Sequence, residues 1–262
     1  APGLLESNNY VRWRGAAGAA ACVEWVLEMG TPPAGAPVKA IPPPQEARQQ
    51  EALSSLKQAR ALAESKDPGA VVAHMRANIR DPGVVCAMCT ILAKGAESNP
   101  HYARRAIEGA GAYSALAAAM REHEESPKVQ GAACKAAGGL AYAAGVMTRS
   151  GEADVVAAMV TGMRAHSGNA VVQEHACGAL QIMCTGAPDN KARAGNQARA
   201  GGAGAVEAVV AAMRAHAGNG GVQERACGAL QNMCNSSPDN RARAVEAGAV
   251  EAVVAAMRAH AG

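Results

Sequence analysis

Aromatic residues are almost missing from this chain. Phenylalanine is absent, and aromatic side chains make up 2% of the 262 residues. Proteins that bind single-stranded nucleic acids commonly stack the bases on aromatic rings, so the composition argues against that class. The net charge is only +3 and charged residues make up 18%, which also argues against a polyanion-binding protein. We expect no nucleic-acid partner.

Long apolar runs and targeting signals are missing as well. The best candidate for a membrane span, residues 16–29, is short and carries Glu24 and Glu28. A transmembrane helix needs about 20 mostly apolar residues, so none is expected. Neither a starting Met nor a signal peptide is visible, and we interpret the chain as processed or partial.

An internal repeat is the most informative feature that is present. Gln173 and Gln223 lie 50 residues apart in matching sequence, and Met213 and Met257 lie 44 apart. A period of this size is typical of repeat architectures. The 50-residue spacing is longer than the 44-residue one because the segment after Asn190 is six residues longer than the matching segment after Asn240. We expect this insertion in a loop, and such loops often mark a binding face.

Each repeat is predicted to contain three helices. A short amphipathic helix ends in Met-Arg-x-His or a variant, a glycine-containing loop follows, and a longer helix such as Val222–Cys234 comes next. A third helix is expected to begin at Pro238, capped by a neighbouring Asp or Asn, and to end at Gly248. The remaining chain divides into an N-terminal helix or arm (1–30), a proline-rich linker (31–45) and a capping helix (46–66), with the repeats over 67–262 and the last one incomplete.

The repeats resemble the armadillo family. The resemblance rests on NRARAVEAGAVEAVVAAMRAH and GNGGVQERACGALQNMC, it covers about 67–262, and the Ala-rich wording looks like tandem armadillo repeats of algal and other protist proteins. The HEAT family is the closest alternative. The resemblance implies an all-α, right-handed α-solenoid, an armadillo-like superhelix of about four three-helix repeats. In that family the third helices line a concave groove that binds extended peptides.

The chain departs from the family at its groove positions. Asn232 matches the family's groove Asn, but Gly228 stands where the family has Trp. In the three earlier repeats, the residues at the Asn position are Ile182, Gly139 and Lys94. The residues at the Trp position are Gly178, Lys135 and Thr90. Peptide binding of the nuclear-import type is therefore not implied, whereas groove binding of another kind stays open.

The candidate protein-binding residues lie in the long helices and in the N-terminal arm. We expect the polar side chains on an exposed face, where they contact a partner or, alternatively, only solvent. They are Gln173, His175, Gln181, Gln223, Arg225, Gln231 and Asn232. In the arm, Trp13 and Trp25 are expected to cover the first repeat; the alternative is that they anchor an interface.

The cysteines and histidines are explained by the repeat rather than by a site. Cys89, Cys134, Cys177 and Cys227 share one repeat position, so we expect buried, reduced thiols of an intracellular protein, in the cytoplasm or an organelle interior. Cys86 and Cys89 form a CxxC, for which a redox pair or half a zinc site is the alternative. A histidine lies at the C-terminal end of each of four successive short helices, where we expect it to contact the last carbonyls of that helix. The histidines of neighbouring repeats lie roughly 10 Å apart, which is too far for them to bind one metal ion together. These are His123, His166, His216 and His260.

No nucleophile–base pair, phosphate loop or metal cluster stands out, so no enzyme activity, cofactor, metal or small-molecule substrate is expected. We expect a non-catalytic scaffold or adaptor that binds protein through its concave face. The alternative is a structural subunit of a larger, organellar or other, assembly. It would be held through its arm and an open C-terminal edge, because Val250–Gly262 begins a repeat without its long helix and leaves the face of Val254 and Met257 uncovered.

Overall fold

A computed structural model describes residues 54, 57–59, 61–144, 152–185 and 190–260. The chain divides into two compact units, Ala1–Arg48 and Gln49–Gly262, and only residues of the second are described. The predicted arm (1–30), with Trp13 and Trp25, and the linker (31–45) therefore lie outside the described residues. Of the predicted capping helix, residues 57–59 and 61–65 are helical.

The described residues are all-helical, as predicted, without a strand, and thirteen of the helices lie between Pro68 and Ala259. The short helices that end in Met-Arg-x-His or its variants are α3 (Pro68–Ala77), α6 (Ala112–Glu122), α8 (Glu152–Ala165), α11 (Ala205–Ala215) and α14 (Ala249–Ala259). The long helices are α4 (Pro82–Ser98), α7 (Pro127–Ala144), α9 (Ala170–Thr185) and α12 (Gly220–Cys234). The remaining elements are α5 (Pro100–Arg104), the π-helical turn η1 (Arg105–Gly109), α10 (Asn190–Gly202) and α13 (Pro238–Glu246).

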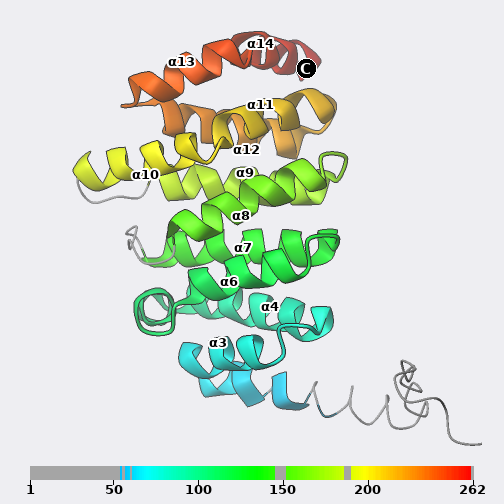
Figure 1. Ribbon diagram of the computed structural model, residues 1–262, viewed down its shortest axis with the longest axis vertical. Helices are drawn as coiled ribbons and strands as arrows, with labels where there is room; N and C mark the ends of the chain where they lie inside the picture. The colour runs from blue at the N-terminus through cyan, green and yellow to red at the C-terminus, as the bar shows by residue number, and fades with distance from the viewer. Residues whose placement is uncertain (1–53, 55–56, 60, 145–151, 186–189, 261–262) are drawn as a thin grey trace, which may run out of the picture. The chain divides into compact units, whose positions relative to one another are not determined.

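Equivalent helices of successive units pack against one another. The long helices contact each other in the order α4, α7, α9, α12, and the short helices in the order α3, α6, α8, α11, α14. Figure 1 shows both series running through this unit from α3 and α4 at one end to α14 at the other. The sequence repeat is thus also a repeat of packing.

Helix boundaries follow from side-chain caps and from glycine. Asp81 accepts hydrogen bonds from the N–H groups of Gly83 and Val84 at 2.8 and 3.1 Å, and Asn219 accepts one from Val222 at 3.0 Å, which satisfies N–H groups that have no partner within the helix. Gly248 separates α13 from α14 with φ +74°. This left-handed conformation favours glycine. The start of α13 at Pro238 is confirmed, and the helix ends at Glu246, two residues before Gly248. Its cap is Ser237, whose hydroxyl accepts from the N–H of Asn240 at 3.3 Å, and not the predicted Asp or Asn.

The six-residue insertion differs from its prediction. Asn196 and Asn240 are equivalent, because their side-chain amides donate to the carbonyls of Met183 and Met233 at 3.0 and 2.9 Å. Upstream of Asn196 the chain is helical from Asn190 on, so α10 has 13 residues where α13 has 9. The insertion was predicted to lie in a loop, and this part of it lengthens a helix instead. Its alanines and charged residues favour helix over turn.

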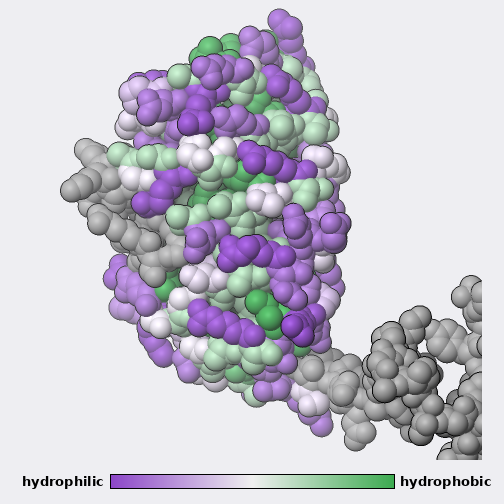
Figure 2. All heavy atoms as spheres, in the orientation of Figure 1, coloured by the Kyte–Doolittle hydropathy of each residue, from purple (hydrophilic) through white to green (hydrophobic). Residues whose placement is uncertain are grey.

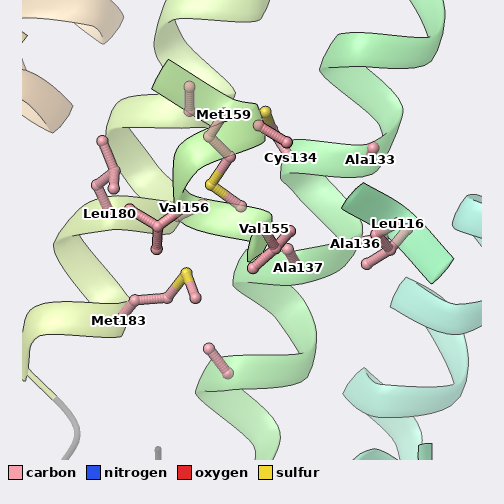
Figure 3. Close-up of a cluster of buried hydrophobic side chains, with 14 of the residues drawn as sticks. Leu116, Ala133, Cys134, Ala136, Ala137, Val155, Val156, Met159, Leu180 and Met183 are labelled. Carbon is pink, nitrogen blue, oxygen red and sulfur yellow. The ribbon is translucent and has the colours of Figure 1, made fainter. Parts of the chain in front are cut away.

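The core is built from small and flexible side chains. Figure 3 shows Leu116 of α6, Val155 and Met159 of α8, and Leu180 and Met183 of α9 gathered around the alanines of α7. All five of these larger side chains are almost fully buried. Alanine lets helices approach closely, and methionine fills the irregular gaps that remain, which explains how a core forms without phenylalanine.

Candidate binding groove on the long helices

Gln173 and Gln223 are buried, so the prediction that they lie on an exposed face is wrong. Their side chains are 1% and 5% exposed. The amide nitrogen of Gln223 donates to the carbonyls of Met213 and His216 at 2.8 and 2.9 Å, and Gln173 makes the same two bonds to Met163 and His166. The glutamine therefore caps the C-terminal end of the preceding short helix, where carbonyls lack partners within the helix.

The histidines join successive units. His123 Nε2 lies 2.7 Å from the carbonyl oxygen of Ile79, in the loop that follows the previous short helix. The other three repeat this contact, as His166 to Glu124, His216 to Ser167 and His260 to Ala217. A carbonyl only accepts, so Nε2 carries the proton. The predicted contact with the last carbonyls of the same helix is replaced by one with the neighbouring unit.

A groove runs over the face formed by the long helices. Its larger hollow has a volume of about 940 Å³ and a smaller adjoining one about 360 Å³; Glu97, Lys135 and His175 line both. The residues of α4, α7, α9 and α12 that line the two hollows include Ala93, Lys94, Glu97, Lys128, Lys135, Gly138, Gly139, Tyr142, Glu174, His175, Gly178, Ile182 and Arg225.

Small residues form the floor of this groove. A Cβ atom at Gly138 would lie 3.1 Å from the Cα of Ala179, so α7 and α9 are in close backbone contact there. A Cβ at Gly139 would meet only Ala93, at 3.8 Å, which is an ordinary contact and leaves space above it. The groove exists because these positions carry almost no side-chain volume.

Two of the predicted site residues line the groove. His175 is half-buried, with its Nδ1 3.1 Å from the carbonyl oxygen of Gly131. Arg225 is exposed and extends from α12 over Gly178, where a Cβ would lie 3.5 Å from its Cδ. Both therefore place polar groups at the wall of the groove.

The other predicted residues of the long helices do not line the groove. Gln181 packs against Gly228, and Gln231 is exposed. Asn232 donates to the carbonyl of Gln181 at 3.0 Å and to the hydroxyl of Thr185, so its amide joins α12 to α9. Its resemblance to the family's groove Asn does not extend to a free amide.

The sequence reasoning missed the lysines and the tyrosine of the groove. In the sequence, Lys94 and Lys135 stand at positions where the armadillo family has Asn and Trp, and those positions are the signal that places them on this face. Lys128, at the start of α7, is the third lysine that lines the groove. Tyr142, at the rim, is 77% exposed. An exposed aromatic ring beside a groove is a feature of protein-binding surfaces.

The CxxC cysteines are buried free thiols. Burial raises the pKa of Cys86 and of Cys89, and raises the pKa of the equivalent Cys134 and Cys177 to about 12. A raised pKa keeps these thiols protonated at neutral pH, which opposes nucleophilic or redox reactivity. Among the described residues, no group of three or more His, Cys, Asp or Glu side chains is placed to hold a metal ion. None of the helices described here is long and apolar enough to cross a membrane.

The outer face of α14 is a second candidate surface. Val250, Val254 and Met257 are exposed, whereas their counterparts on α11 are buried; Met257 is 67% exposed and the equivalent Met213 is 2% exposed. In Figure 2, hydrophilic and hydrophobic residues interleave over the face shown, and green atoms also lie at the end formed by α13 and α14. The predicted uncovered apolar edge is present.

Comparisons with protein-family models, with curated proteins and with solved structures found no match to this chain.

Proposed function

We propose that this chain is an armadillo-like, right-handed α-solenoid that acts as a non-catalytic scaffold and binds an extended segment of a protein partner in the groove. The observation that carries this proposal is the groove itself, a hollow of about 940 Å³ lined by four successive long helices. Concave surfaces of this kind are the binding surfaces of repeat proteins.

The regular packing of the units supports the solenoid. Each long helix contacts the next, and the histidine bond from each short helix to the preceding unit recurs four times. Contacts restricted to neighbouring units are what distinguishes repeat arrays from globular folds. The protonated, buried thiols also fit a protein of a reducing compartment.

The size of the groove suits a short extended segment. Packed helices lie about 8–10 Å apart, so four long helices span roughly 24–30 Å between their axes. An extended chain advances about 3.3 Å per residue, and a segment of about 7–9 residues would cross all four helices.

A photo-crosslinking experiment tests the proposal. Tyr142 is replaced by the photoreactive residue benzoylphenylalanine, which keeps an aromatic ring at the rim, and Arg121 on the short-helix face is replaced in the same way as a control. We expect Tyr142 crosslinks to a protein partner and none from Arg121. We also expect Gly139→Trp, which fills the groove, to abolish the Tyr142 crosslink, whereas Gly139→Ala keeps it.

The opposite pattern would exclude the groove. A partner that crosslinks equally from both positions, or whose crosslink survives Gly139→Trp in a folded protein, does not occupy this surface.

The exposed face of α14 supports a second candidate function, a structural subunit of a larger assembly held through its arm and its C-terminal edge. Exposed apolar surface on a helix is stabilised when another protein covers it. If this function is correct, Met257→Glu dissociates the chain from its complex, and Gly139→Trp leaves the complex intact. The reverse result favours the scaffold.

A further inference from the structure

We propose that the groove selects an extended segment rich in acidic residues. This inference rests on the proposed function, because it names the chemistry of the segment that the groove would bind. It is carried by the charges of the groove walls and by the spacing of the helices that present them.

Cations outnumber anions in the groove. Its walls carry Lys94, Lys128, Lys135 and Arg225, against Glu97 and Glu174. No salt bridge joins any of these four cations to another residue in the described ranges. Arginines elsewhere do have carboxylate partners, for example Arg243 with Glu207 at 3.4 Å. The groove cations are therefore available to carboxylates of a ligand.

The positions of the cations match an extended chain. Lys94 lies on α4, Lys135 on α7 and Arg225 on α12. Neighbouring helix axes lie about 8–10 Å apart, and every second residue of an extended segment advances about 6.6 Å on the same face. Carboxylates two to three residues apart can thus meet Lys94 and Lys135 on the adjacent helices α4 and α7. Arg225 on α12 lies two helix spacings, about 16–20 Å, beyond α7, so a carboxylate about five or six residues further along the segment can meet it. Small side chains between the carboxylates lie on the floor of glycine and alanine.

A protein segment fits this surface better than a nucleic acid. Both would bring negative charge, but single strands gain much of their affinity by stacking bases on aromatic rings. Tyr142 is the single aromatic residue that lines the groove in the described part of the chain. Electrostatic complementarity of this kind sets the specificity of a complex and makes its affinity depend on salt.

The experiment is a selection of random nine-residue peptides displayed on phage against the full chain. Peptides are kept if they bind this protein and fail to bind Gly139→Trp, with Gly139→Ala as the matched control that must still bind. We expect the retained peptides to be enriched in Asp and Glu. The double variant Lys94→Glu/Lys135→Glu should weaken their binding by about a hundredfold, that is, about tenfold for each reversed charge.

The control for charge is Arg121→Glu/Arg258→Glu. It changes the net charge by the same amount at two exposed arginines outside the groove, and we expect peptide affinity to change by less than about threefold, as for charges far from a binding site at physiological salt. Circular dichroism confirms that each variant is folded before its binding is compared.

The other outcomes separate this inference from the proposed function. Groove-dependent peptides without acidic enrichment would overturn acidic selection and leave the scaffold function in place. If no peptide depends on the groove, both fail. A last outcome would identify a nucleic acid as the ligand and overturn the inference. It is that a 12-nucleotide oligothymidylate abolishes the Tyr142 crosslink to the partner at physiological salt, whereas the selected peptides leave that crosslink unchanged.

Discussion

Replacing Gln223 by methionine should destabilise the protein by about 1–2 kcal/mol. Its amide donates to the carbonyl oxygens of Met213 and His216 at 2.8 and 2.9 Å, and the side chain is buried. The His216 oxygen also accepts from the N–H of Asn219 at 2.9 Å, so it loses only one of two bonds, about 0.5–1.5 kcal/mol. The Met213 oxygen would be left buried without this donor, which costs about 1–3 kcal/mol. Methionine has nearly the same volume, so no large cavity adds to the sum. It also removes the buried Oε1 of Gln223, which has no hydrogen-bond partner among the described residues, and this recovers about 1–2 kcal/mol of the cost.

The assay is urea unfolding followed by circular dichroism at several protein concentrations. Gln231→Met is the matched control, because Gln231 lies on the same helix and is exposed, and we expect its effect to stay within about 0.5 kcal/mol. If the two variants have the same free energy of unfolding, the buried glutamine does not cap α11, and the assignment of Gln173 to the same role fails with it.

Three further predictions concern stability and thiol chemistry. Gly248→Ala should cost about 1 kcal/mol, because residue 248 has φ +74°, whereas the exposed Gly218→Ala should be neutral or slightly stabilising in the same unfolding assay; equal effects would contradict the backbone argument. Val210→Glu should lower the free energy of unfolding by at least about 3 kcal/mol, since the residue is 1% exposed. Val254→Glu, at the equivalent position of α14, should change it by less than about 1 kcal/mol because it is 39% exposed. Burial raises the pKa of Cys134 to about 12, so its thiol stays protonated at pH 8. After iodoacetamide treatment, site-resolved mass spectrometry should find Cys134 unmodified in the native protein and modified in urea. Labelling of the native protein at the rate of the unfolded chain would show instead that the thiol is accessible.

Much of the helical layout could be predicted from the sequence. Proline at a helix start and glycine after a run of helix formers act within one turn of the chain, so the start of α13 at Pro238 and its end just before Gly248 were predicted correctly, whereas its cap is Ser237 and not the predicted Asp or Asn. The start of α10 was not predicted correctly. The shorter matching segment of the next repeat favours a loop for the extra residues, whereas their alanines and arginines have helical propensity, and the helix extends into the insertion.

The candidate site was predicted less well, because exposure depends on how helices pack. Gln223 and Arg225 are two residues apart on one helix, and the sequence placed both on an exposed face. The structure leaves Arg225 exposed and turns Gln223 towards the end of α11. Likewise, Lys94 and Lys135 lie in one site because α4 and α7 form adjacent walls of the groove.

The sequence by itself determined that the chain is helical, where most of its helices end, and that its units repeat, because propensity, capping and apolar periodicity are local properties of the chain. Only the tertiary structure decided which polar residues are buried as caps, that each histidine bonds to the preceding unit, and that small residues from three helices leave a groove walled by lysines. These features need atoms from separate helices to come within a few ångströms of each other, and no spacing along a single helix specifies that distance.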